Sequence, residues 1–233
     1  MPASRVRLGR KIENLKKRVL ALGSQVEDHV RLSVKAITTG DPEMATRVID
    51  GDLEIDQAEV DLEEECLEIL ALHQPVAIDL RYIVAVMKIN NDLERIGDLA
   101  VNIAETAVYV ASRRRVDLPF DYGPMAEKTR IMLKKSLDAF VTMDVKIAFE
   151  VCAQDDEVDY MKHFIHKQFE QKIREPDGEL EALVHLFLVS RHLERIADHA
   201  TNIAEDVIYM VTGDIHRHRG ALDYREINGK ETS

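Results

Sequence analysis

The stretch LERIGDLAVNIAE at residues 93–105 returns as LERIADHATNIAE at residues 193–205, and ten of its 13 positions hold the same residue in both copies. Apolar residues recur in any duplicated core, whereas polar residues on a solvated helix face are free to drift. The chain is therefore an internal duplication, and its repeated polar residues need an explanation of their own. Those residues are Glu94, Asp98, Asn102 and Glu105 in the first copy and Glu194, Asp198, Asn202 and Glu205 in the second.

The repeat and the composition together predict the class of fold. In a chain of 233 residues the repeat favours two similar units of about 100 residues each. Only 6 Pro and 10 Gly interrupt the chain, and aromatic residues make up 5% of it. Ala, Leu, Ile, Val, Glu, Asp, Lys and Arg dominate, which is typical of helical proteins.

Breaks in the apolar spacing divide the chain into six long helices. In the first unit we expect helices over residues 5–38, 42–72 and 78–112, with Gly40 just past the end of the first and Asp41 capping the second. In the second unit we expect them over residues 124–141, 144–175 and 178–212. Asp144 is the expected cap there, because it precedes its helix as Asp41 does. Residues 113–124, RRRVDLPFDYGP, interrupt the periodicity and form the linker.

Short connections between long helices force neighbouring helices to run antiparallel. The sequence thus predicts an all-α protein of two tandem antiparallel three-helix bundles, related by a pseudo-twofold internal repeat. The first bundle is assigned to residues 1–115 and the second to residues 116–212. Residues 213–233 lack clear periodicity and are expected to form a loosely ordered tail.

The charge of the chain restricts its partners. A formal net charge of −12 repels phosphate backbones and anionic lipid, so it argues against nucleic acid and favours basic partners or metal cations. There is no run of about 18 apolar residues and no apolar signal region, so we expect a cytoplasmic protein with no membrane insertion. Cys66 and Cys152 form no CxxC pattern and are expected to be reduced thiols in the core.

Four pairs of acidic residues stand at i, i+4, where both side chains lie on one helix face, about 5–6 Å apart between Cβ atoms. Like charges at that spacing cost a few tenths of a kcal/mol, yet the pairs occur on the second and third helices of both units. If those helices are neighbours, two pairs converge in each bundle. The pairs are Asp52 with Asp56, Glu94 with Asp98, Asp155 with Asp159, and Glu194 with Asp198.

Converging carboxylates form cages of hard oxygen ligands suited to Mg, Ca, Mn or Fe ions, with Zn also possible. Asn102, Asn202, Glu105 and Glu205 extend the same stripes and are weaker candidates as ligands. His163 and His166 follow Asp159 on roughly its own face and could add nitrogen ligands in the second unit. The alternative is that each pair belongs to an ordinary solvated face.

Motifs of known catalytic sites are missing from the sequence. It contains no GxxxxGK[ST], GxGxxG, GxSxG or HExxH, and no Glu-x-x-His of the kind used by di-iron oxidases. A carboxylate pair can serve as general acid and base. However, no motif supplies an oxyanion hole or a substrate pocket, so we expect a protein that is not an enzyme.

At these residues the chain resembles the PhoU family of phosphate-signalling proteins. That family consists of two three-helix domains in tandem, each with an E(D)xxxD signature, which is matched by ERIGD at residues 94–98 and ERIAD at residues 194–198. HQPVAIDLR at residues 73–81 is similar to the family's turn before the third helix, whereas the second unit has EPDG at residues 175–178. The resemblance covers residues 5–212.

The resemblance implies a cytoplasmic regulator, usually a homodimer, that links the ATPase subunit of a phosphate ABC transporter to a sensor histidine kinase. Such a regulator represses the phosphate-starvation response when phosphate is plentiful. Some members bind iron or zinc clusters on these motifs. Carried over by position, the ligands are Asp52, Asp56, Glu94, Asp98, Asp155, Asp159, Glu194 and Asp198.

Two other functions fit the same residues. A metal-dependent enzyme of the helical carboxylate type would use the acidic clusters for catalysis. A PhoU-like accessory subunit of another transporter would share the fold but have a different carrier as its partner.

Overall fold

The computed structural model describes residues 2–113, 119–174 and 180–215, and within these ranges the chain is helical and contains no strand. The predicted all-α class is confirmed. The helices, in chain order, are α1 (Pro2–Thr39), α2 (Pro42–His73), α3 (Ile78–Ala111), α4 (Gly123–Thr142), α5 (Val145–Cys152), α6 (Asp155–Lys172) and α7 (Leu180–Thr212).

The second helix of each repeat begins with the same cap, as predicted. The carboxylate of Asp41 accepts a hydrogen bond from the Met44 amide at 3.0 Å, and that of Asp144 accepts one from the Lys146 amide at 2.8 Å. Such a cap satisfies amides that the first turn of a helix leaves without a partner. Gly40 follows α1 with a φ of 67°, a left-handed conformation that favours glycine.

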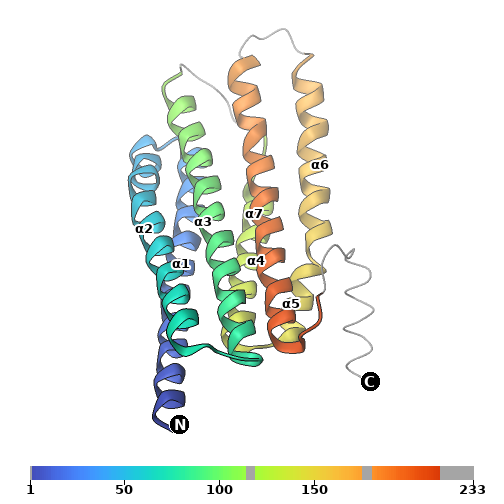
Figure 1. Ribbon diagram of the computed structural model, residues 1–233. Coiled ribbons are helices and arrows are strands. Elements are labelled where there is room, and N and C mark those ends of the chain that lie inside the picture. Colours follow the sequence, from blue (N-terminus) through green and yellow to red (C-terminus); the bar gives the residue numbers. More distant parts are fainter. Residues whose placement is uncertain (1, 114–118, 175–179, 216–233) are drawn as a thin grey trace.

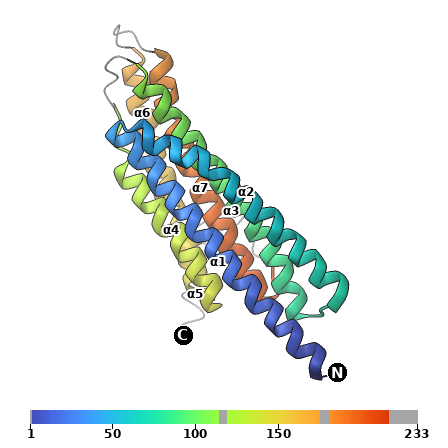
Figure 2. The ribbon, with the colours of Figure 1, turned by 90° about the vertical axis from the view of Figure 1, so that its left-hand side faces the viewer.

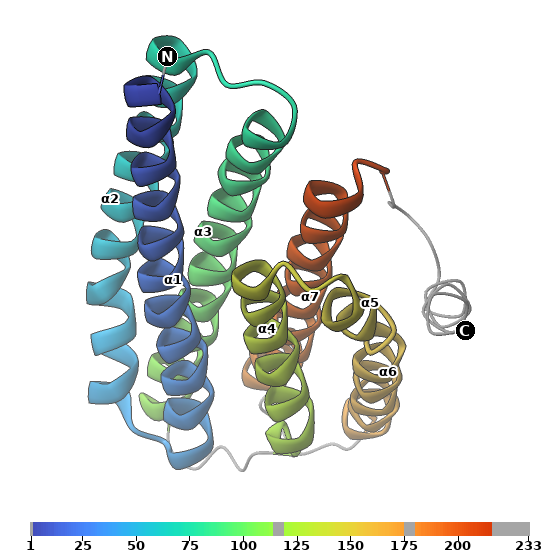
Figure 3. The ribbon, with the colours of Figure 1, turned by 90° about the horizontal axis from the view of Figure 1, so that it is seen from below.

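The helices form two bundles that lie side by side along their length. Helices α1, α2 and α3 pack on one another, as do α4, α7 and the pair α5–α6, and α3 contacts α7 between the bundles (Figures 1 and 3). The molecule is elongated along the helix axes (Figure 2). Two tandem three-helix bundles are confirmed, while the predicted boundary at residue 115 and most of the predicted tail lie outside the described residues.

The second bundle differs from the prediction in one detail. Instead of one helix over residues 144–175, the chain forms α5 and α6, with a break at Ala153 and Gln154. Three acidic residues, Asp155 to Glu157, occupy the first turn of α6. Negative side chains are stabilised near a helix N-terminus by the helix dipole, which favours a new helix at this point. In the first bundle α2 continues through the corresponding region without a break.

The two repeats also agree in their packing. From Asp52 to Glu65 in α2, each residue has the same degree of burial as the residue 103 positions later, from Asp155 to Gln168 in α6. The same holds for residues 93–104 of α3 and residues 193–204 of α7, which are 100 positions apart. These two registers therefore identify structurally equivalent positions in the two bundles.

None of the helices in the described ranges is both long and apolar enough to cross a lipid bilayer.

The contact between Gly97 of α3 and Ile55 of α2 sets how closely these helices approach. A Cβ atom added at Gly97 would lie 3.3 Å from Ile55 Cγ2 and 3.5 Å from Asp52 Oδ1. At the equivalent positions the second bundle has the larger Ala197 and the smaller Val158. A larger residue on one helix is thus matched by a smaller residue on the other.

We expect Ile55→Val alone to lower the free energy of unfolding by about 1 kcal/mol, because it removes a buried methylene. In a Gly97→Ala background the same change should cost less, since valine makes room for the new Cβ atom. Urea denaturation of the two single variants and the double variant measures this coupling. A coupling energy of zero would contradict the proposed steric match.

Candidate functional site

The first carboxylate cluster lies between α2 and α3. Asp52 and Asp56 extend from α2, and Glu94 and Asp98 extend from α3, so the structure brings the two predicted pairs together. Burial raises the pKa of Asp52 to about 6, and the charges of Asp56 and Asp98 add to this effect. Burial also raises the pKa of Glu94, with further contributions from Asp98, Glu59 and Asp56. These side chains disfavour one another's charge.

One oxygen of the first cluster has no donor within the described part of the chain. Asp52 Oδ1 is buried and accepts no hydrogen bond from those residues. A buried acceptor left without a partner is costly, and a charged acceptor is more so. A cation placed here would satisfy this oxygen and offset the repulsion among its neighbours.

The second carboxylate cluster lies between α6 and α7. Burial raises the pKa of Asp155 to about 6, and the charges of Asp198 and Asp159 make smaller contributions in the same direction. Asp155 Oδ1 also accepts a hydrogen bond from Thr201 Oγ1 at 3.4 Å. Burial likewise raises the pKa of Asp198, and Glu194 adds to that shift. The structure thus brings together the two predicted pairs of the second bundle.

A lysine side chain reaches into the second cluster. Lys162 Nζ lies 2.7 Å from Glu194 Oε1 and 3.2 Å from Asp159 Oδ1. Its positive charge also lowers the pKa of Asp198, against the larger effect of burial. The second cluster therefore contains a cationic group of its own.

The chemistry of the donors restricts which ion would suit these clusters. Among the described residues, no three His, Cys, Asp or Glu side chains are placed to hold one metal ion together. Both cysteines are buried in the core, as predicted, and burial raises the pKa of Cys66 to about 12. Neither is a thiolate ligand. Oxygen-only donors suit Mg, Mn, Ca or iron ions better than zinc.

The weaker candidates take other positions. Asn102 Nδ2 donates to the carbonyl oxygen of Asp98 in its own helix at 2.9 Å, and Glu105 is exposed. Asn202 Nδ2 instead faces Asp92 of the other bundle, with 3.4 Å to its Oδ1 atom. Glu205 lines a cavity that Asp155 and Asp198 also line.

The two histidines considered as nitrogen ligands are both exposed. The His166 ring packs against Phe187, with 5.5 Å between ring centroids, and its Nδ1 atom lies 3.7 Å from Glu170. These contacts direct His166 toward other neighbours. Within the described ranges, no hydrogen bond or ion pair links His163 to the carboxylates.

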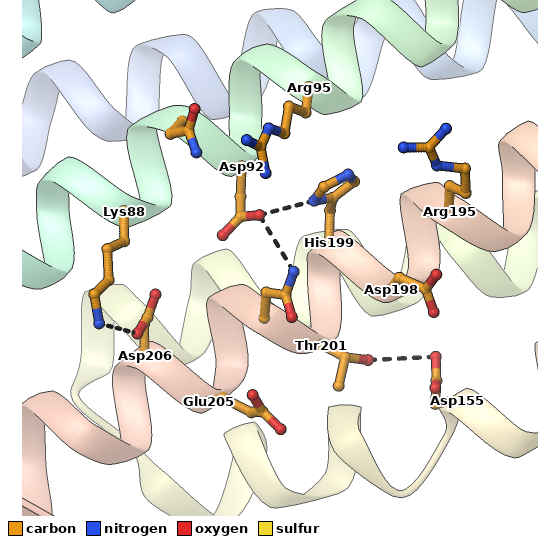
Figure 4. Close-up of a pocket in the computed structure, with 12 residues that line it drawn as sticks. Lys88, Asp92, Arg95, Asp155, Arg195, Asp198, His199, Thr201, Glu205 and Asp206 are labelled. Atoms are coloured by element: carbon orange, nitrogen blue, oxygen red, sulfur yellow. Dashed lines mark hydrogen bonds and ion pairs between the residues drawn. The ribbon is translucent and has the colours of Figure 1, made fainter. Parts of the chain in front are cut away.

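Sequence reasoning missed a polar seam where α3 packs against α7 (Figure 4). His199 Nδ1 lies 2.8 Å from Asp92 Oδ1, and both side chains are buried. Lys88 Nζ forms an ion pair between the same helices, 2.9 Å from Asp206 Oδ1. The seam borders a cavity of about 660 Å³ lined by Lys88, Asn91, Asp92, Arg95, Asp155, Arg195, Asp198, His199, Thr201, Asn202, Glu205 and Asp206.

The residues of the seam are not repeated in the other bundle. This departure from the repeat is the one sequence signal that could have indicated the seam. The position of His199 corresponds to Leu99, and the position of Asp92 corresponds to His192. His192 has a buried Nδ1 atom that finds no hydrogen-bond partner among the described residues, and burial lowers its pKa. The contact between Asp92 and His199 therefore forms once, although the helices that carry it are duplicated.

We expect His199→Leu to lower the free energy of unfolding by about 3 kcal/mol, because it removes the 2.8 Å imidazole contact of the buried Asp92 carboxylate. Adding Asp92→Leu should restore part of that loss, since an apolar pair needs no partner in the seam. Urea denaturation measures both values. Equal losses in the single and double variants would show that the contact between Asp92 and His199 is not the cause.

The raised pKa values of Asp52 and Asp155 predict how stability depends on pH in the absence of metal. Between the ordinary Asp pKa of 3.8 and about 6, the folded protein binds more protons than the unfolded chain. These two groups therefore make the fold less stable as the pH rises through that range. Across this range, the urea concentration at the unfolding midpoint should fall more steeply with rising pH for the natural protein than for the double variant Asp52→Asn/Asp155→Asn. Parallel profiles would refute the prediction.

Comparisons with known proteins agree with the observed architecture. The family described as "PhoU domain" matches residues 19–107 and, a second time, residues 123–207. The crystal structure of PhoU from Pseudomonas aeruginosa is similar, with a TM-score of 0.84 and 34% identity, covering 88% of this chain and 99% of that one. The regulatory protein PhoU of the phosphate transport system from Streptococcus pneumoniae gives a TM-score of 0.83 and 26% identity, covering 91% of this chain and 100% of that one.

Two curated relatives have the name "Phosphate-specific transport system accessory protein PhoU". The protein from Serratia marcescens is 35% identical over 209 residues, which covers 90% of this chain and 86% of that relative. The protein from Escherichia coli K12 is 32% identical over 209 residues, covering 90% and 87%. Both tandem bundles are matched, so this chain belongs to the PhoU family.

Proposed function

We propose that this protein is a cytoplasmic accessory regulator of a phosphate-transport system. The observation that carries the proposal is the family match to both bundles, together with relatives named as accessory proteins of phosphate-specific transport. In this role a homodimer contacts the ATPase subunit of a phosphate ABC transporter and a sensor histidine kinase. It keeps the phosphate-starvation response repressed while phosphate is plentiful.

We further propose that the protein acts by binding its partners and not by catalysis. Its sequence has none of the phosphate loops, nucleophile elbows or zinc-protease motifs that supply catalytic machinery. Its elongated bundles instead offer long helix faces to other proteins. An adaptor needs such surfaces more than it needs a reaction centre.

The first carboxylate cluster is the proposed metal-binding part of this regulator. Asp52, Asp56, Glu94 and Asp98 would hold the ion by rotating toward it, since among the described residues no three of these side chains already stand around one point. The buried Asp52 Oδ1, which has no hydrogen-bond partner among those residues, supports this assignment. When bound, the ion supplies positive charge that neutralises the acids of α2 and α3. The residues themselves come from two helices, so binding would stabilise the contact between those helices.

The signalling role is tested by deleting the gene in the source organism. In phosphate-rich medium, deletion should derepress the genes for phosphate scavenging, and a copy of the gene supplied in trans should restore repression. Transcript levels of those genes are the measurement. An unchanged response in the deletion strain would refute the proposed role.

The partners are tested by capturing the tagged protein from phosphate-replete cells and identifying bound proteins by mass spectrometry. We expect a transporter ATPase or a sensor histidine kinase. Capture of a different type of carrier, with neither of these, would instead indicate an accessory subunit of another transporter.

Metal binding is tested on chelator-treated protein by thermal unfolding. Adding Mn²⁺ at about 100 times its dissociation constant should raise Tm by roughly 5–10 °C. Asp52→Asn/Asp98→Asn should lose this increase, because two oxygen ligands of the first cluster become weaker. Glu64→Gln, an exposed change on α2 outside the cluster, is the matched control. An equal increase in all variants would place the ion elsewhere.

A further inference from the structure

Two equivalent positions in the carboxylate clusters hold side chains of opposite charge. In the 103-residue register that equates Asp52 with Asp155 and Asp56 with Asp159, Glu59 of α2 corresponds to Lys162 of α6. The burial of neighbouring residues matches throughout this region, and both side chains are partly buried. The charge reversal is thus a difference between two otherwise similar sites.

Lys162 is held inside the second cluster by ion pairs to both of its helices. Its Nζ atom lies 2.7 Å from Glu194 Oε1 on α7 and 3.2 Å from Asp159 Oδ1 on α6. The carboxylates raise the pKa of Lys162, although burial opposes this effect. The ammonium therefore remains charged and contacts two of the carboxylates that would have to hold a metal ion.

Glu59 makes the first cluster more acidic. It accepts a hydrogen bond from Asn90 Nδ2 of α3 at 3.1 Å, so its partner in the opposite helix is a neutral amide. Burial raises the pKa of Glu59, and the charges of Glu63 and Asp56 add to this effect. The charge of Arg95 lowers the pKa of Glu94, against the larger effect of burial. However, among the described residues no lysine or arginine forms an ion pair with the acids of this cluster.

We propose that Lys162 is a built-in cation that excludes metal from the second cluster, so that the two repeats of this protein differ in metal binding. The inference rests on the proposed metal binding of the first cluster. A metal ion entering the second cluster must displace an ammonium that is tethered beside its ligands and ion-paired to two of them. A metal ion entering the first cluster displaces no charged group.

The proposal is tested by exchanging the two charges in the full-length, chelator-treated protein. Lys162→Glu gives the second cluster the residue found in the first, and Glu59→Lys does the reverse. Isothermal titration with Mn²⁺ measures the number of sites and the affinity. Lys162→Arg retains the positive charge, while Lys167→Glu and Glu64→Lys change exposed residues on the same two helices as controls.

We expect the natural protein to bind Mn²⁺ at one cluster and Lys162→Glu to bind it at both, with affinity at the second cluster rising about tenfold or more. Glu59→Lys should bind at neither cluster, and the double exchange should bind at the second alone. Lys162→Arg and the two controls should behave like the natural protein.

A second measurement, thermal unfolding without metal, reports the role of Lys162 independently of binding. Lys162→Glu should have a lower Tm than the Lys167→Glu control, because its carboxylates lose their cation, and Mn²⁺ should restore that Tm.

If Lys162→Glu binds no more Mn²⁺ than the natural protein, the inference is overturned. If the natural protein already fills both clusters, the inference fails while metal binding stands. If the natural protein binds no metal but Lys162→Glu gains a site, binding at the first cluster and the difference between the repeats both fail, and only the exclusion of metal by Lys162 stands.

Discussion

The packing of α3 against α7 is the constraint on which the rest of the molecule depends. Each of these helices buries one face in its own bundle and another against its counterpart, which leaves one stripe exposed. The carboxylates of the repeated motif lie on that stripe and meet the acids of α2 or α6 there. Because α3 and α7 contact neighbours on most of their surface, the positions of both clusters are set by the same core that holds the bundles together.

The duplication has been retained most closely where packing requires it and has diverged where charge or volume could be balanced locally. Ile55 with Gly97 corresponds to Val158 with Ala197, so a change on one helix is matched by the opposite change on its neighbour. In the acidic clusters, Lys162 stands where the first repeat has Glu59. Repulsion among converging acids is relieved by protonation or by a counter-charge. A metal ion from solution and a lysine from the chain are two physically different ways to provide it.

The polar seam has a separate consequence for the whole molecule. A buried carboxylate is tolerated only when it is paired, so Asp92 of the first bundle requires His199 of the second. Lys88 and Asp206 add another pair across the same helices. Such pairs contribute little net stability compared with apolar packing, but a shift of either helix would break them. The seam thereby favours one relative position of the two bundles.

Local sequence alone determined much of this structure. The caps at Asp41 and Asp144, the turn at Gly40 and the apolar periodicity act within a few residues, so the helices and their duplication could be predicted. The acidic pairs could also be predicted, because their i, i+4 spacing places them on one helix face. Only the tertiary structure decided that Asp92 meets His199 and that Lys162 enters the second cluster, since those contacts join residues far apart in the chain. The break before α6 was also missed, because the preference of three acidic residues for the first turn of a helix is too weak to determine a helix start without tertiary packing.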